Sequence, residues 1–331
     1  MFRAITLFAL TLTLFTIGLG TFIHTADSGL GCPQWPGCVG KPMSEIVSAN
    51  TPSFNPASEE KMARVRIDIR SHRLMAGWVC LSILILSSWV WALRQHRMRA
   101  TVLIMISLAV VIAQAMLGIF TLNHSLLPVA VASHVLLGFL ILLLLFLLLV
   151  TVRASKSPPV ATSPLTFRFQ AWLGLLLVMG QLALGGWASA HYAGLACPEF
   201  PGCQGLTWAD FDFRGGFAIN LDSDPGEART LLPLKARAAI HWAHRMVGLV
   251  TWLLLTLLAI MMAANKHSRH VQRTGVGLAL LIQIQTGSGI AAILMRLPLV
   301  IEVLHAIMAG LLLMMMAYIG IVLSRQADES R

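Results

Sequence analysis

Four histidines lie within or at the edge of strongly apolar segments: His72, His134, His244 and His305. Segments this apolar are typical of membrane spans, and an ionisable side chain inside a membrane is costly and by default indicates function. A single histidine in an apolar helix is more often a structural hydrogen-bonding residue, but four at similar positions favour pairs of ligands. Two imidazoles that face each other across a helical bundle can hold a heme iron. A structural zinc or copper site would favour additional cysteine or carboxylate ligands, and the sequence places none at this depth.

We expect His72 to face His134 and His244 to face His305. An arginine directly follows the first histidine of each pair, Arg73 after His72 and Arg245 after His244. The planar guanidinium suits carboxylates, so these arginines are candidate partners for heme propionates. The alternative is an interfacial arginine that reaches toward water along an apolar stem. Recurrence after both histidines favours the propionate role. His241, three residues before His244 on the same helix face, is a candidate to hydrogen-bond the site, with a ligand or filler role as the alternative.

The segments that must position these histidines are long enough to cross a bilayer as helices, which takes about 20 apolar residues. Of the 331 residues, 57% are hydrophobic and 11% charged. Helices are expected because a lipid-exposed backbone must satisfy its own hydrogen bonds. The first segment could be a signal peptide, but no clear small-residue cleavage site follows it, and a repeat makes it equivalent to the fifth. We predict an all-α polytopic membrane protein with eight transmembrane helices at 4–23, 73–93, 101–121, 129–152, 169–188, 238–263, 274–295 and 299–323.

The net charge of +10 is concentrated in short connections between these segments, which contain no Asp or Glu. The basic residues there are Arg94, Arg97, Arg99, Arg153, Lys156, Arg168, Lys266, Arg269 and Arg273. The positive-inside rule assigns these connections and both termini to the cytoplasm. The long loops 24–71 and 189–237 mix both signs and are expected on the outer, periplasmic side of the inner (plasma) membrane. The charge therefore reports membrane topology, and no nucleic-acid partner is predicted.

Each long loop contains two cysteines six positions apart, in CPQWPGC and CPEFPGC. The pairs are Cys32/Cys38 and Cys197/Cys203, and the outer compartment is one in which disulfides persist. We predict both pairs as disulfides. A bridge that closes so short a loop gives modest entropic stabilisation, so a structural staple is favoured for Cys197 and Cys203. For Cys32 and Cys38, a redox or lid role stands beside the structural one.

The sequence contains an internal repeat. The two copies align at a shift of 165 residues up to the cysteine loops and of 171 or 172 beyond them. The aligned pairs include Gly20/Gly185, His72/His244, Gln114/Gln285, Gly118/Gly289 and His134/His305. Each copy has four segments, an even number, so both halves enter the membrane in the same orientation, unlike the inverted repeats of many transporters. We predict two parallel, pseudo-symmetric four-helix bundles, residues 1–152 and 169–331, joined by a cytoplasmic linker at 153–168.

Together these features resemble the heme A synthase family. The resemblance rests on eight segments in two halves, the two cysteine loops, and the motifs SHRL, IHWAHRM, SHVLLG and LHAIMAG around the four histidines. It covers essentially the whole chain apart from the linker and the ends of the outer loops. It implies an oxidoreductase that converts heme O to heme A for cytochrome oxidases by oxidising a ring methyl group to a formyl group. Oxidising an inert methyl calls for an iron-centred or radical route that side chains alone cannot supply.

The resemblance also assigns the two histidine pairs. His72 and His134 would ligate or position the substrate heme O, whereas His244 and His305 would ligate a heme b cofactor. The implied partners are heme O, delivered from membrane lipid, a heme O synthase, and an electron donor or acceptor. A homo-oligomer is compatible with the pattern.

One position departs from the family pattern, which usually has a glutamate three residues before the first histidine. This chain has Ile69 there, and Asp68 lies one residue earlier. Positions three and four residues before His72 lie on either side of it, about 100° apart around a helix. If the helix extends that far, Asp68 is the candidate catalytic carboxylate with a shifted geometry. The alternative is an interfacial charge.

Two other functions fit the same histidines. A diheme membrane cytochrome that only transfers electrons needs the same bis-histidine sites. It would hold both hemes permanently and make no heme A. A heme O transporter or chaperone would bind the same substrate and leave its methyl group unchanged.

Overall fold

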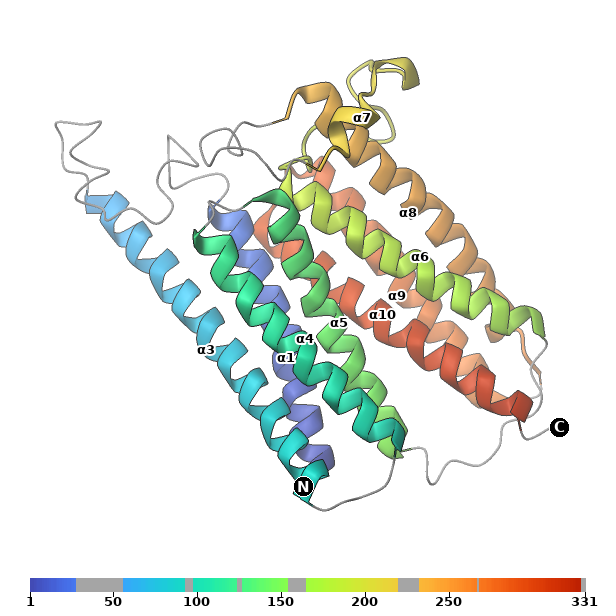
Figure 1. Cartoon of the computed structure of the whole chain (residues 1–331). Helices are drawn as coiled ribbons and strands as arrows, with labels where there is room; N and C mark the ends of the chain where they lie inside the picture. Colours follow the sequence, from blue (N-terminus) through green and yellow to red (C-terminus); the bar gives the residue numbers. More distant parts are fainter. Residues whose placement is uncertain are drawn as a thin grey trace.

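The computed structural model describes residues 1–27, 56–92, 98–123, 127–153, 165–219, 232–266 and 268–328. Within these ranges the chain forms long helices and no strand (Figure 1). The helices are α1 (Phe2–Asp27), α3 (Pro56–Ala92), α4 (Met98–Asn123), α5 (Pro128–Arg153), α6 (Leu165–Ala190), the short α7 (Phe213–Gly216), α8 (Leu234–Ala263), α9 (Arg269–Leu294) and α10 (Leu299–Asp328). A short 3-10 helix, η2 (Trp208–Asp210), precedes α7. The predicted all-α class is confirmed.

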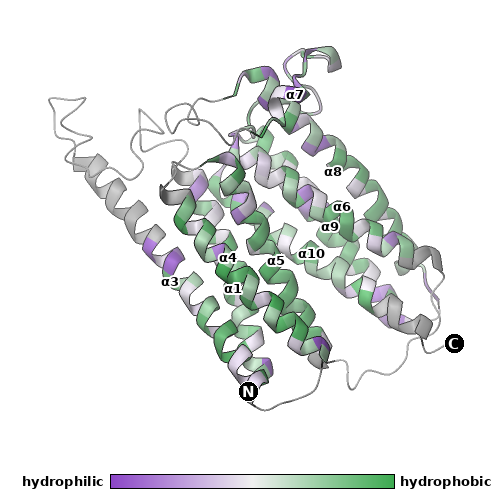
Figure 2. Ribbon diagram, in the orientation of Figure 1, coloured by the Kyte–Doolittle hydropathy of each residue, from purple (hydrophilic) through white to green (hydrophobic). Residues whose placement is uncertain are grey.

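Eight of the described helices are long and apolar enough to cross a membrane, as predicted. Figure 2 shows hydrophobic residues along most of the length of these helices. The spans are Phe2–Thr25, Arg70–Trp91, Met98–Phe120, Pro128–Thr151, Phe169–Ala190, Leu234–Ala263, Arg269–Leu294 and Leu299–Ile321. The largest difference from the predicted bounds is at α9, which begins at Arg269 rather than at residue 274. Ser268 caps this helix by accepting a hydrogen bond from the Val271 N–H, so the helix starts in a polar stretch that hydropathy alone does not reveal.

Each half of the chain closes its own ring of helix contacts. In the first half, α1 packs on α3, α3 on α4, α4 on α5, and α5 on α1. In the second half, α6 packs on α8, α8 on α9, α9 on α10, and α10 on α6. The halves meet where α10 contacts α1 and α5, and where α5 contacts α6. The division of the chain at the 153–168 linker and the pseudo-symmetry of the halves stay predictions, and these contacts support them.

A hydrophobic core runs across the junction between the halves. Leu142 of α5 and Leu313 of α10 are fully buried there. A Cβ on Gly310 of α10 would lie 3.0 Å from side-chain atoms of both Leu14 in α1 and Leu142 in α5. Small residues let helices approach closely inside a membrane, where van der Waals packing drives association. Gly310 therefore allows the close contact among α1, α5 and α10.

The two ends of the helical bundle differ. The beginning of α1 and the end of α10 lie at one end, and α7 and the segment between α6 and α8 lie at the other (Figure 1). This separation agrees with the predicted placement of the termini and the second cysteine loop on opposite sides of a membrane. The identity of the cytoplasmic side stays a prediction.

Candidate functional site

Each of the four predicted histidines packs against a glycine of a neighbouring helix. The pairs, with the distance from a Cβ built on the glycine to the histidine Cε1, are Gly20 and His72 at 3.2 Å, Gly118 and His134 at 3.2 Å, Gly185 and His244 at 3.3 Å, and Gly289 and His305 at 3.0 Å. Carbon atoms in ordinary contact lie about 3.5–4.0 Å apart. Any residue larger than glycine would therefore push against the ring. The four glycines fix how close each ring lies to the next helix.

A glutamine lies four residues before three of these glycines and therefore on the same helix face. The three contacts are Gln114 Nε2 to the His134 backbone oxygen at 2.9 Å, Gln181 Nε2 to the His244 backbone oxygen at 3.0 Å, and Gln285 Nε2 to the His305 Nε2 at 3.3 Å. The fourth position is Thr16, whose hydroxyl donates to the backbone oxygen of Leu12 in its own helix. The face of α1 near His72 thus has no glutamine amide at this position.

The pairing of the histidines stays a prediction, and their charge interactions support it: His72 interacts with His134, and His305 interacts with His244. The Nδ1 atoms of His72, His134 and His244 are buried and have no hydrogen-bond partner in the described part of the chain. Buried polar atoms are nearly always hydrogen-bonded in native proteins. These three rings therefore do not fit the alternative of purely structural hydrogen-bonding histidines.

The donor set fits a metal that brings most of its own ligands. Among residues that the structure describes, no group of three or more His, Cys, Asp or Glu could hold a metal ion. A structural zinc site requires four protein ligands. A heme iron requires only axial ligands from the protein, and a pair of imidazoles supplies both. Two histidines in each half match the number of axial ligands that a heme iron takes from a protein.

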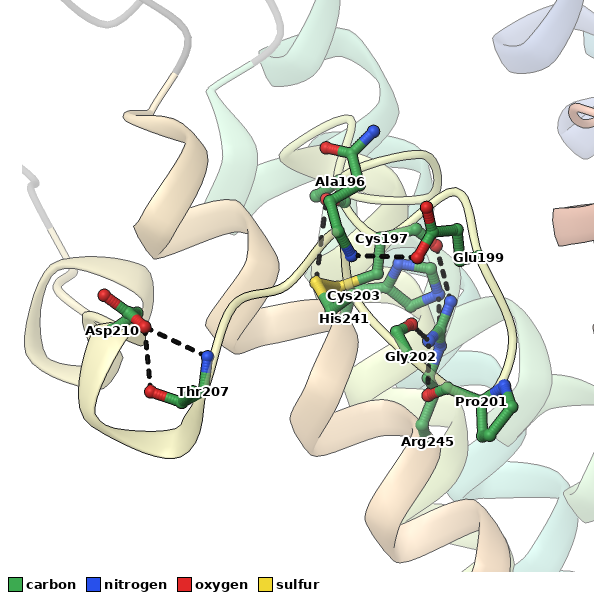
Figure 3. Close-up of a disulfide and its surroundings, with 11 residues drawn as sticks. Ala196, Cys197, Glu199, Pro201, Gly202, Cys203, Thr207, Asp210, His241 and Arg245 are labelled. Carbon is green, nitrogen blue, oxygen red and sulfur yellow. Dashed lines mark hydrogen bonds between the residues drawn. A yellow bond between two sulfur atoms is a disulfide. The ribbon is translucent and has the colours of Figure 1, made fainter.

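Arg245 connects the α8 helix to the second cysteine loop (Figure 3). Its guanidinium donates to the backbone oxygens of Cys197 and Gly202, the latter at 2.9 Å. Its Nε donates to His241 Nε2 at 3.3 Å. His241 is buried and accepts this hydrogen bond from Arg245, whereas its role toward the heme site stays a prediction. The contact of Arg245 with a propionate stays a prediction.

Cys197 and Cys203 form the predicted disulfide. Both cysteines are buried, and they pack with Phe211 against Ala238 and Ala239 near the start of α8. The loop therefore covers the end of the helix that carries His244. The other predicted pair, Cys32 and Cys38, lies outside the described residues.

The charged candidates of the first half lie at the beginning of the α3 span. Helix α3 begins at Pro56, so Asp68 lies within the same helix as His72, as a catalytic role of Asp68 requires. The side chain of Asp68 lies outside the described part of the chain. Arg73 is exposed. The roles of Asp68 and Arg73 stay predictions.

Three polar residues beside the histidines were not predicted from the sequence. Gln181 could have been found from the Gln-x-x-x-Gly spacing that it shares with Gln114 and Gln285. Ser288 lies 3.0 Å, measured from its Oγ, from the Nδ1 of His305. Glu302 is partly buried one turn before His305, so the expectation that no carboxylate lies near the histidines is wrong; a carboxylate within an apolar segment is itself a signal.

Two groups just outside the spans have shifted pKa values. Burial lowers the pKa of His191 to about 4, and its ring packs on Trp187 with centroids 4.5 Å apart. Hydrogen bonds from the Thr207 backbone and hydroxyl, and then from Lys235, lower the pKa of the Asp210 carboxyl to about 2. Both groups lie in the segment between α6 and α8.

Comparison with known proteins gives a consistent result. Residues 3–317 match the family described as cytochrome oxidase assembly protein. The heme A synthase of Shewanella oneidensis is 32% identical over 324 residues, which cover 97% of this chain and 96% of that protein. Those of Alkalihalophilus pseudofirmus and Halalkalibacterium halodurans are each 25% identical, over 92% and 95% of this chain and 92% and 96% of those proteins. The chain therefore belongs to the cytochrome oxidase assembly protein family that includes the heme A synthases.

Proposed function

We propose that this chain is a heme A synthase, a membrane oxidoreductase that converts the methyl group of heme O to the formyl group of heme A. The observation that carries the proposal is the set of four histidine–glycine contacts, two in each half, in a chain similar over almost its full length to heme A synthases. A structural role for the histidines would not explain why every ring meets a glycine at the same close distance.

The two histidine pairs are assigned different ligands. His72 and His134 hold or position heme O as the substrate, and His244 and His305 hold a heme b cofactor. Each pair lies within one ring of helices, and no further protein ligand is needed for either iron. When bound, heme b supplies one-electron redox chemistry that protein side chains lack.

The side chains around these pairs position and enclose the reactants. Glycines seat the rings, and Gln114 and Gln181 hold the backbone of the ligand helices through the carbonyls of His134 and His244. Arg73 and Arg245 are proposed to bind heme propionates. Asp68 is proposed as the carboxylate of the substrate half, one turn before His72. The apolar helices exclude water from both pairs.

The setting of the enzyme is also part of the proposal. The chain lies in the plasma membrane with both termini in the cytoplasm, and the cysteine loops lie outside. Its protein partners are a heme O synthase and an electron donor or acceptor. The basic connections between the spans and the bundle ends described above support this orientation.

The test is to express the chain aerobically with a source of heme O and to identify the extracted hemes by chromatography and mass spectrometry. Wild type should yield heme A. The His72→Ala and His134→Ala variants should yield no heme A and retain heme b, whereas His244→Ala and His305→Ala should lose heme b. Recovery of only heme O and heme b from wild type would refute the synthase and favour a heme carrier or a diheme cytochrome. Normal heme b in both second-half variants would refute the ligand assignment.

A further inference from the structure

His305 differs from the other three histidines in how its ring is held. Ser288 Oγ lies 3.0 Å from its Nδ1, and Gln285 Nε2 lies 3.3 Å from its Nε2. The Nδ1 atoms of His72, His134 and His244 have no hydrogen-bond partner among the described residues. A backbone oxygen faces three of the rings in the same way, Thr16 toward His72, Gln114 toward His134 and Gln285 toward His305, so the Ser288 hydroxyl is what sets His305 apart. His305 is thus the ligand with a complete set of contacts.

The contacts of Ser288 specify the tautomer of His305. The Ser288 hydroxyl donates its hydrogen to the backbone oxygen of Gln285 at 2.9 Å. When the Ser288 hydroxyl gives its single hydrogen to Gln285, its oxygen accepts toward His305, and this arrangement places the ring hydrogen on Nδ1. The Gln285 Nε2 lies 3.3 Å from the His305 Nε2, and this contact agrees with the same tautomer because the amide nitrogen faces the ring.

This tautomer is the one that an iron ligand needs. An iron would take the Nε2 lone pair in place of the Gln285 amide, while the Nδ1–H stays held by an acceptor. Such an acceptor orients the ring and makes the coordinating nitrogen more basic. Ser288 supplies this without any charged group, which suits the apolar interior.

The corresponding position in the first half cannot do the same. Gly289 aligns with Gly118 and His305 with His134, so Ser288 aligns with Leu117. Leucine has no hydrogen-bonding atom in its side chain. The two halves therefore share their histidines and glycines but differ at the residue beside the glycine.

We propose that Ser288 is a positioning residue that makes the second half a retaining heme site, and that Leu117 leaves the first half able to release its heme. The inference rests on the proposed function, in which heme b stays bound and heme O must be exchanged for heme A. The serine holds His305 in the ligating tautomer before heme binds and strengthens its bond to ferric iron afterwards. Without an equivalent contact, His134 holds its iron more weakly and allows exchange.

The experiment compares Ser288→Ala and Ser288→Thr in the full-length protein purified with heme b. The matched control is Ser107→Ala, since Ser107 is also buried and its hydroxyl bonds only within its own helix, to the Leu103 backbone oxygen. One measurement is the rate of heme b transfer to excess apomyoglobin, and the other is the midpoint potential of the bound heme. Loss of an acceptor behind a ligating histidine typically costs about 10–100-fold in metal affinity, so release from Ser288→Ala should be faster by that order.

The midpoint potential should rise in Ser288→Ala because the Nδ1–H acceptor favours ferric iron. A tenfold preferential loss of ferric affinity corresponds to about 59 mV for a one-electron couple. Ser288→Thr keeps the hydroxyl and should resemble wild type in both measurements, as should Ser107→Ala. If Ser288→Ala does not accumulate, the shape-matched pair Ser288→Thr and Ser288→Val provides the same comparison.

Two failures can be distinguished. If wild-type heme b depends on His244 and His305 but Ser288→Ala matches Ser107→Ala in release rate and potential, the role of Ser288 is overturned and the proposed function stands. If heme b content does not depend on either histidine, the proposed ligand assignment itself fails.

Discussion

Replacing Gly289 with alanine should displace His305 while leaving helix α9 intact. The new Cβ would lie 3.0 Å from the His305 Cε1, 3.5 Å from Nδ1 and 3.8 Å from Nε2. Because carbon contacts normally lie at about 3.5–4.0 Å, the ring must move by about 0.5 Å or more. The Ser288 Oγ to Nδ1 distance of 3.0 Å would then approach the limit at which a hydrogen bond is lost.

The stability and the heme affinity of this variant should respond differently. The lost hydrogen bond costs about 1 kcal/mol, and the helix propensity of alanine over glycine offsets it by at most about 1 kcal/mol. The thermal midpoint should therefore change little. Misplacing a ligand and losing its acceptor should lower heme b affinity by about tenfold or more.

The assay measures heme b per protein and the rate of its transfer to apomyoglobin, beside thermal unfolding in detergent. Gly287→Ala is the matched control, because it makes the same change two residues away in α9 and its Cβ would have no atom within 4 Å. It should retain heme b normally. Equal heme retention in Gly289→Ala and Gly287→Ala would refute the reasoning that glycine is needed to seat the histidine.

Three further predictions concern other parts of the molecule. Arg245→Ala should speed reduction of the Cys197–Cys203 disulfide by dithiothreitol about tenfold or more, since it removes at least two hydrogen bonds to the loop. Maleimide labelling of the freed thiols measures the rate. An unchanged rate would contradict the role of Arg245 in anchoring the loop. The pKa of about 4 for His191 lies below the ordinary value of 6.5, so in this pH range the unfolded segment between α6 and α8 binds a proton that the folded segment does not. The free energy of unfolding of this segment should therefore fall as the pH drops from 6.5 toward 4. Hydrogen exchange of the segment should show this loss in wild type and not in His191→Phe; equal pH dependence in both would count against it. Leu117→Ser should slow release of heme from the first half about tenfold, measured by transfer to apomyoglobin, and an unaltered release rate would show that the added hydroxyl does not reach His134.

Much of the fold follows from the sequence because bilayer thickness sets segment length. The eight spans were predicted with ends within a few residues, and the exception at Arg269 arises because a capping serine can begin a helix in a polar stretch. The Cys197–Cys203 bridge was also predictable, since two cysteines in so short a loop have little choice of partner. The four histidines and four glycines were identified from the repeat, and the structure brings each histidine against a glycine that lies 16 to 59 residues away in the sequence.

The contacts that distinguish the two halves could not be read from the sequence. Gln181 has no glutamine counterpart in the repeat, since the aligned residue is Thr16, and only the packing of α6 on α8 shows that its amide reaches the carbonyl of His244. Arg245 was expected to face a propionate, and its contacts with the cysteine loop depend on how that loop folds back over α8.

The sequence by itself determined the number of spans, and it predicts the depth of the histidines and the equivalence of the two halves, because hydropathy, charge and repeat spacing are local or periodic properties. The tertiary structure decided which glycine meets which ring and placed a serine hydroxyl beside the Nδ1 of His305. Those outcomes depend on the rotation of each helix about its axis and on distances of a few tenths of an ångström between helices. A repeat makes two sites alike, and only packing reveals that Ser288 holds one ligand where Leu117 leaves the other without a hydroxyl.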